Sequence, residues 1–252
     1  MSPEPPVPLT AVRDEPPCPK IVVIDANGSM EPCLSALHPR NQWLGQCADV
    51  AEFLASGLEP DIVVLDLALR RDGQPWVVRA HAVEAMVGAG CRVLLHTLER
   101  RPLLVAAAIE AGASGLVDKA DGPQAFDRAL AVVANGGQQV IEPGSALEDI
   151  LRGGVPVLTD RQWQVLIART NGQAWRELAR RLFITEAVAR EHLAAATAKL
   201  SGHVLDRSPG SLAWALGVHP GDTFAEMLAD RRQIGELARR RPAGLCADVI
   251  SC

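Results

Sequence analysis

The chain has 252 residues, a length that suits one large domain or two ordinary ones, and 48% of them are hydrophobic, enough to bury a substantial core. Its net charge of −5 excludes a protein that is basic overall, although a local basic segment could still bind nucleic acid. No apolar run is long enough to span a membrane, and the N-terminus lacks the layout of a signal peptide. We therefore expect a cytoplasmic protein without a membrane partner.

Cysteine and histidine spacing gives no sign of a metal or catalytic centre. The six cysteines include no Cys-x-x-Cys pair and are not accompanied by clustered histidines. Reduced thiols in a cytosolic protein are therefore the better interpretation, and zinc is not expected. Since no nucleophile with an adjacent base is evident either, we do not expect an enzyme.

The first half of the chain alternates between strand and helix patterns, after a proline-rich segment at 1–19 that predicts a disordered tail. Strands are predicted at 20–25, 42–47, 61–67, 91–97 and 115–119, and helices at 29–38, 48–56, 77–90, 102–113 and 123–137. Five βα units in this order predict an α/β domain over 20–137, a doubly wound five-stranded parallel sheet with flanking helices.

Four polar side chains stand where predicted strands end: Asp25, Asp66, Thr97 and Lys119. In a parallel sheet the carboxyl ends of the strands share one edge, where such folds place their functional groups. We therefore expect these four side chains to converge. The alternative for Asp66 is that it only closes a strand.

Residues 158–200 have the pattern of three short helices with two tight breaks. Thr159 and Thr185 are suitable N-caps, and Asn171-Gly172 is a helix stop signal. The segment carries seven Arg or Lys and four acidic residues, a net charge of +3. A helix, a turn and a second helix with a basic outer face fit a DNA major groove. We therefore predict an all-α helix-turn-helix domain over 158–207; the alternative is a helical bundle used only for packing or dimerisation.

This segment resembles the C-terminal domain of NarL/LuxR-type response regulators. The matching residues are Leu158-Thr159, Arg161, Val165-Leu166, Glu177-Leu178-Ala179, Leu182, Ile184-Thr185, His192 and Lys199-Leu200. The family has Glu, Glu, Thr, Val and Lys where this chain has Gln162, Gln164, Val188, Ala189 and Arg190. The resemblance implies that helix 186–200 reads double-stranded DNA.

The first domain resembles the receiver domains of the same regulators, and the stretch 108–119, AIEAGASGLVDK, matches their A-L-x-A-G-A-x-G-Y-L-x-K pattern. The resemblance implies that Asp66 is the phosphoacceptor, in a pocket with Asp25, Thr97 and Lys119. Lys119 would pair with the phosphoryl oxygens and Thr97 would hydrogen-bond one of them. A sensor kinase is the donor that the family implies, and nothing in the sequence identifies one.

The pocket departs from a working receiver in two ways. Receivers hold Mg²⁺ with an acidic pair after the first strand, but this chain has Asp25-Ala26-Asn27. Asp25 and Asp66 remain as metal ligands, so we expect magnesium to bind weakly or not at all, and no other cofactor. Leu116 stands at the aromatic switch position and the chain has no tyrosine, so the family's usual coupling from Thr97 to an aromatic ring cannot operate.

Side chains in the helix-turn-helix segment are candidates for DNA contacts. Arg190 stands where the family has a groove-reading lysine, and arginine can bond guanine through two donors. Arg180, Arg181 and Lys199 are candidates for phosphate contacts, although each is equally an ordinary surface cation. Thr185 caps the reading helix and completes the predicted DNA-binding set.

Two further segments complete the predicted organisation: a linker at 138–157 and a helical extension at 208–252. Within the extension, 222–241 places Phe224, Met227, Leu228, Ile234 and Leu237 near one face of a helix. This apolar face either packs on the body of the protein or forms part of a homodimer, the assembly that such regulators use on paired half-sites.

Two functional interpretations follow. The favoured one is a DNA-binding transcriptional regulator with a degenerate receiver pocket, whose activity need not depend on phosphorylation. The alternative is a ligand- or protein-sensing module, in which the receiver-like domain binds a small molecule or a partner and DNA binding is secondary.

Overall fold

The computed structural model describes residues 18–67, 78–140 and 145–240, so most of the predicted tail at 1–19 lies outside it. Its parallel sheet has the strand order β2-β1-β3-β4-β5-β6. The strands are β1 (Lys20–Ile24), β2 (Gln42–Cys47), β3 (Ile62–Leu65), β4 (Arg92–Thr97), β5 (Gly115–Asp118) and β6 (Gln139–Val140). The five predicted parallel strands are confirmed. The two-residue β6 is an addition, paired to β5 at the start of the predicted linker.

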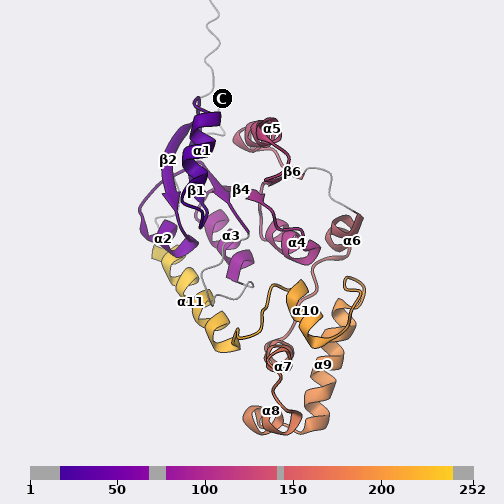
Figure 1. Cartoon of the computed structure of the whole chain (residues 1–252). Helices are drawn as coiled ribbons and strands as arrows, with labels where there is room; N and C mark the ends of the chain where they lie inside the picture. Colours follow the sequence, from indigo (N-terminus) through magenta and orange to yellow (C-terminus); the bar gives the residue numbers. More distant parts are fainter. Residues whose placement is uncertain (1–17, 68–77, 141–144, 241–252) are drawn as a thin grey trace, which may run out of the picture.

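Helices cover both faces of this sheet (Figure 1). One face packs against α1 (Met30–Leu37) and α5 (Pro123–Ala134), and the other against α2 (Val50–Ala55), α3 (Val78–Gly88) and α4 (Pro102–Glu110). Alternate strand residues serve the two cores: Ile21 and Val23 pack with Phe126 of α5, whereas Val22 and Ile24 pack with Phe53 of α2. Because both faces are buried, the strands are continuous apolar runs, as the sequence indicated.

The predicted helix-turn-helix domain is also confirmed, as α7 (Asp160–Thr170), α8 (Trp175–Leu182) and α9 (Glu186–Leu200). Thr159 and Gln162 form a reciprocal capping box at the start of α7. Phe183 ends α8 in a left-handed conformation (φ 56°), and the chain then turns into α9. Val165, Ala168, Leu178, Leu182 and Ala189 form a small core shared by the three helices.

Three helices join the two domains. The predicted linker contains α6 (Ser145–Gly153), which packs on α4 through Leu147 and Ile150. Next, α10 (Pro209–Ala215) packs against both α7 and α4. Finally, α11 (Phe224–Arg240) returns to the receiver-like domain and lies along α2 and α3 (yellow in Figure 1). One contiguous apolar core therefore extends from the sheet into the C-terminal helices.

The destination of α11 decides between the two predictions for its apolar face. Met227 and Ile234 are buried, and Phe224 and Leu237 pack against the same core. The face is covered by the chain's own α2 and α3, so the prediction that it packs on the body is confirmed. Met227 and Ile234 are therefore not available for a dimer contact, and a role of the rest of the extension in dimerisation stays a prediction. None of the described helices has the length and apolar character needed to cross a membrane.

We expect Ile234→Ala to lower the free energy of unfolding by about 2–4 kcal/mol, because it leaves a cavity between α11 and the receiver-like domain. Urea denaturation measures this effect. The control is Glu236→Ala in the same helix, where the side chain is exposed and the change should stay within about 0.5 kcal/mol. Equal effects of the two substitutions would contradict the packing of α11 on the domain.

Candidate functional site

The four predicted strand-end residues meet at one edge of the sheet. Lys119 Nζ lies 2.6 Å from Asp25 Oδ2 and 2.7 Å from Asp66 Oδ2. Thr97 Oγ1 donates a hydrogen bond of 2.7 Å to the other oxygen of Asp66, Oδ1. The structure thus brings together Asp25, Asp66, Thr97 and Lys119, and the role of this cluster in phosphoryl chemistry stays a prediction.

Burial makes the electrostatics of this cluster strong. Asp25 is 3% exposed and Asp66 is 8% exposed, so both carboxylates depend on Lys119 for a counter-charge. Desolvation lowers the pKa of Lys119, but its hydrogen bonds to Asp25 and Asp66 outweigh that effect and raise the pKa above the usual value. Lys119 therefore stays protonated at neutral pH, and it links the ends of three strands.

The turn after β1 is fixed by its own hydrogen bonds. The backbone N–H of Asn27 donates to Asp25 Oδ1 at 2.7 Å. The side-chain amide of Gln46 donates to the carbonyls of both Asp25 and Asn27, at 2.7 Å each. Each oxygen of the Asp25 carboxylate therefore already accepts a hydrogen bond from within the chain.

The magnesium ion that the resemblance implies would find fewer ligands in this pocket than in a receiver with an acidic pair. Where receivers have a second acid, this chain presents the methyl group of Ala26. The two remaining carboxylates, Asp25 and Asp66, already share the ammonium group of Lys119. Across the described parts of the chain, no three His, Cys, Asp or Glu side chains gather as a metal site would require. Mg²⁺ usually keeps several waters and binds one or two carboxylates, and here both carboxylates would have to give up their hydrogen bonds to Lys119, so weak or absent magnesium binding stays a prediction.

His96 is a buried titratable residue of the pocket region that the sequence analysis missed. Its ring contacts Phe126 edge-on at 5.1 Å, and no hydrogen-bond partner for its Nδ1 is found among the described residues. Burial first, and the charge of Lys119 second, lower the pKa of His96 from 6.5 to about 4, against opposing effects of Asp66 and Asp25. The sequence did contain a signal for His96, which is its position next to Thr97 in β4, because neighbouring strand residues face opposite sides of a sheet.

The predicted DNA-contacting residues have different surroundings in the structure. Arg190 is exposed on α9, where its guanidinium lies 4.4 Å from the ring centroid of Trp175 and 3.7 Å from Glu186. Arg169 packs on the same Trp175 ring at 4.5 Å. Trp175 was missed in the sequence, and it orients Arg190 through a cation–π contact.

Lys199 and Thr185 make contacts within the domain. Lys199 Nζ donates to the carbonyl of Val157 at 2.7 Å and to Gln162 Oε1 at 3.0 Å. Lys199 therefore holds the end of α9 against the start of α7. Thr185 caps α9 by accepting from the backbone N–H of Val188. Both residues thus have structural roles, whatever they contact in DNA.

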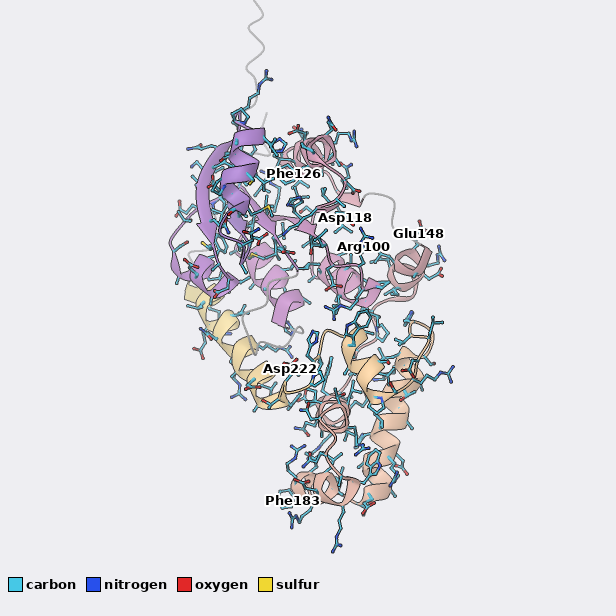
Figure 2. The ribbon with its side chains drawn as sticks, in the orientation of Figure 1. Arg100, Asp118, Phe126, Glu148, Phe183 and Asp222 are labelled. Atoms are coloured by element: carbon cyan, nitrogen blue, oxygen red, sulfur yellow. The ribbon has the colours of Figure 1, made fainter. Side chains whose placement is uncertain are left out.

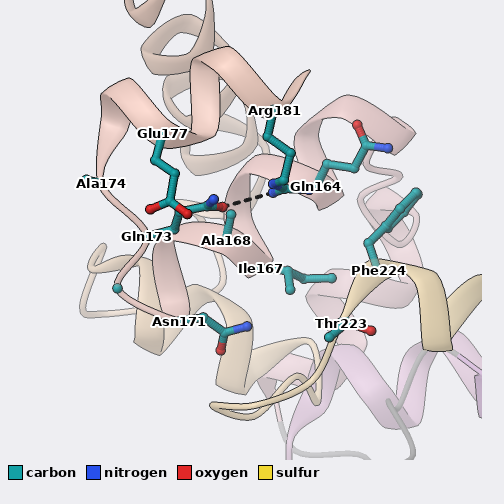
Figure 3. A pocket seen from close by; sticks show the side chains of 11 residues that line it. Gln164, Ile167, Ala168, Asn171, Gln173, Ala174, Glu177, Arg181, Thr223 and Phe224 are labelled. Carbon is teal, nitrogen blue, oxygen red and sulfur yellow. Dashed lines mark hydrogen bonds between the residues drawn. The ribbon is translucent and has the colours of Figure 1, made fainter. Parts of the chain in front are cut away.

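The two arginines near the end of α8 differ from each other. Both are exposed, and Arg181 also donates to Gln173 Oε1 at 3.0 Å. Figure 3 shows Arg181 extending from α8 toward Gln173, along the wall of a hollow of about 630 Å³ between α7, α8 and the start of α11. Arg176, which the sequence analysis did not single out, is also exposed on α8. Arg176, Arg180, Arg181 and Arg190 are thus all exposed, and their contacts with DNA stay predictions.

Comparisons with known proteins agree with this two-domain architecture. No protein-family model matches the chain. The chain is 28% identical over 142 residues to the transcriptional regulatory protein DesR of Bacillus subtilis, a match that covers 56% of this chain and 67% of DesR. It is 30% identical over 133 residues to the methanol utilization control regulatory protein MoxX of Paracoccus denitrificans, covering 50% of this chain and 58% of MoxX.

Solved structures show the same fold over most of the chain. The complex of the two-component response regulator RcsB with DNA superposes with a TM-score of 0.52 at 16% identity, covering 79% of this chain and 98% of RcsB. RcsB of Salmonella enterica serovar Typhimurium, bound to a promoter with a phosphomimetic, gives a TM-score of 0.53 at 15% identity, covering 86% of this chain and 98% of RcsB. The class is thus a receiver-like domain followed by a helix-turn-helix domain. The resemblance to response regulators of the NarL/LuxR type is confirmed by sequence relatives and by fold.

We expect Lys119→Met to lower the free energy of unfolding by about 3 kcal/mol, because two buried carboxylates would lose their shared counter-charge. Adding Asp66→Asn to this variant should recover part of the loss, since one of the two negative charges is then removed. Chemical denaturation of the wild type and of the single and double variants measures both effects. Additive losses would show that Lys119 does not bridge the two acids.

Acidification should destabilise the fold through His96. Its pKa is lower in the folded chain than in the unfolded one, so the unfolded chain takes up the proton first. The contribution of His96 is therefore complete above pH 6.5 and is lost as the pH falls toward 4. Between pH 7 and 5 it amounts to about 2 kcal/mol. His96→Leu should remove this dependence in urea titrations, whereas a change at the exposed His203 should not.

Proposed function

We propose that this chain is a DNA-binding transcriptional regulator of the response-regulator type, whose binding to DNA does not require phosphorylation of Asp66. The observation that supports it most is the combination of an exposed reading helix with a pocket whose groups are satisfied by one another. The structures of RcsB bound to DNA give the precedent for this architecture on DNA.

The exposed reading helix is the first support. α9 packs against α7 and α8, and its N-terminal half lies with α8 at the end of the molecule far from the sheet (Figure 1). In helix-turn-helix proteins these N-terminal residues are the ones that meet base edges. Arg190 stands in this half of α9, and Arg176 and Arg180 are exposed on α8, so we infer that this end can approach DNA without a rearrangement of the receiver-like domain.

The composition of α9 limits how much sequence it can read. Its outer side chains include Ala187, Ala194 and Ala195, which offer no hydrogen-bond donor, and two acids, Glu186 and Glu191. We infer that Arg190 carries most of the direct base reading and that specificity is modest for one copy. A homodimer on two half-sites would raise it, and an RcsB structure holds two dimers on two parallel DNAs.

The self-satisfied pocket is the second support. Asp25, Asp66, Thr97 and Lys119 hydrogen-bond one another, and Ala26 removes the acid that would recruit magnesium. A phosphoryl group would need a metal to offset its charge next to two carboxylates. In this proposal the regulator therefore needs neither magnesium nor a sensor kinase in order to bind DNA.

One observation favours the alternative of a ligand-sensing module. A hollow of about 590 Å³ lies between the β4–α4 loop and α10, a size typical of small-molecule sites. Leu98, Leu205 and Trp214, three of the exposed large apolar side chains, line it. In that case DNA binding would depend on a small apolar molecule.

The proposal predicts that the full chain binds DNA without any phosphodonor, and that Asp66→Asn, which cannot be phosphorylated, also binds DNA. Arg180→Ala should lower the slope of log affinity against log salt by about one on any DNA, because one phosphate contact is lost. Arg190→Ala should cost about 1–3 kcal/mol on the preferred site and less on scrambled DNA. Fluorescence anisotropy over a salt series measures all of these, on a site selected from genomic fragments.

The control is Arg232→Ala, an exposed cation on α11, which should leave both affinities unchanged. Binding that appears only after treatment with a phosphodonor, or that is lost in Asp66→Asn, would contradict the proposal. Binding that requires an added cell extract of small molecules would favour the ligand-sensing alternative.

A further inference from the structure

The loop that follows β4 begins at the pocket. Thr97 Oγ1, which donates to Asp66 Oδ1, also accepts a hydrogen bond of 3.1 Å from the backbone N–H of Glu99. The position of the Thr97 hydroxyl thus sets the position of Glu99. A group that took this hydroxyl away from its present place would release the start of the loop.

Glu99 in turn fixes Arg101 through three hydrogen bonds. Glu99 Oε1 accepts from the backbone N–H of Arg101 at 2.9 Å and from its Nε at 2.8 Å, and Oε2 accepts from Nη2 at 2.6 Å. The two side chains are only 8% and 13% exposed. Burial alone would raise the pKa of Glu99, but the hydrogen bonds and charge of Arg101 bring it below its usual value. The pair is therefore a charged, two-point contact of defined geometry.

The remaining side of Arg101 reaches into the C-terminal part of the chain. Its Nη1 donates to the carbonyl oxygen of Trp214 at 2.8 Å, and its guanidinium lies 5.0 Å from the centroid of the Trp214 ring. Trp214 belongs to α10, which packs on α7 of the helix-turn-helix domain. One arginine thus connects the loop beside the pocket to a helix that supports the DNA-binding domain.

We propose that Arg101 is a latch through which the state of the Asp66–Thr97 pair sets the position of α10. Receivers usually couple the switch threonine to an aromatic ring within their own domain, and this chain has Leu116 at that position. The aromatic side chain that contacts the loop after β4, here called the switch loop, is instead Trp214 of α10. If a change at Asp66 Oδ1 moves the Thr97 hydroxyl, the backbone N–H of Glu99 loses its hydrogen-bond acceptor. The Glu99–Arg101 pair then shifts, and the contacts of Arg101 with Trp214 weaken.

The latch does not depend on the proposed DNA function, because α10 can be observed without DNA. Only its consequence, a change of DNA affinity, depends on that function. The two ideas can therefore fail separately.

Hydrogen–deuterium exchange on the full chain tests the latch through the backbone amides of 212–218, which include the Gly217 N–H bonded to the same Trp214 carbonyl. Arg101→Gln should raise exchange in this segment about ten- to hundredfold, the loss expected for a hydrogen bond to a charged group. The matched control is Arg100→Gln. Arg100 and Arg101 both line the hollow between the β4–α4 loop and α10. Arg100, however, is 73% exposed and pairs with Asp118 at 3.1 Å (Figure 2), so its replacement should not change exchange in 212–218.

Coupling to the pocket is tested by Thr97→Val, which alters no atom near α10. The latch predicts that this variant also raises exchange in 212–218, by roughly two- to tenfold. In the double variant Thr97→Val with Arg101→Gln the two increases should not multiply, because both substitutions interrupt the same series of contacts. Unchanged exchange in Thr97→Val, or multiplied effects in the double variant, would show that Arg101 holds α10 without coupling it to the pocket, and would overturn the proposal.

A variant that removes both charges serves as the control for misfolding of Arg101→Gln. Arg101→Gln alone leaves Glu99 buried without its partner, whereas Glu99→Gln with Arg101→Gln keeps the loop neutral. The double replacement should retain the wild-type circular dichroism and still show fast exchange in 212–218. Slow exchange in this folded variant would show that the guanidinium does not hold α10.

Discussion

The ammonium group of Lys119 between Asp25 and Asp66 is the interaction on which the remainder of the structure depends. Two carboxylates buried this close together would repel each other and favour protonation if no cation separated them. Lys119 removes that conflict and ties together the carboxyl ends of β1, β3 and β5. With Asp66 held on one oxygen by Lys119, its other oxygen accepts a hydrogen bond from Thr97. The switch loop and its contact with α10 follow from that orientation.

The same interaction changes what the pocket can respond to. In the receiver pattern the acids face both a metal ion and the lysine that corresponds to Lys119. Here the lysine faces them, and the missing acid at Ala26 means that a divalent ion would have to displace Lys119 while gaining few new oxygen ligands. The pocket is therefore complete within the chain. An input that acts on it must compete with hydrogen bonds of 2.6–2.7 Å between buried groups.

Much of this architecture could be predicted because local patterns determine it. The buried β-branched runs predicted the sheet, and the rule for parallel strand ends predicted that Asp25, Asp66, Thr97 and Lys119 would meet. The caps at Thr159 and Thr185 set the helix-turn-helix boundaries. The DNA-binding roles of Arg180, Arg190 and their neighbours remain predictions.

Features that depend on distant pairing could not be predicted. An apolar stripe on α11 shows that one face is buried but not which surface covers it. The contact from Arg101 to Trp214 joins residues 113 positions apart, and no periodicity encodes it. Likewise, Lys199 has the sequence environment of a surface cation, and only the fold brings the Val157 carbonyl within its reach.

The three connections between the domains limit how a signal can act. Leu147, Ile150, Met227 and Ile234 are buried where α6 and α11 pack on the receiver-like domain. At about 1.5–3 kcal/mol for each fully buried side chain, exposing all four would cost on the order of 10 kcal/mol. Coupling between two sites in a protein is typically worth about 1–3 kcal/mol. A signal of that size cannot free α6 and α11 from the receiver-like domain, but it is comparable to one charge-assisted hydrogen bond. Regulation in this chain is therefore expected to shift α10 at a single contact, with the packing of α6 and α11 left intact.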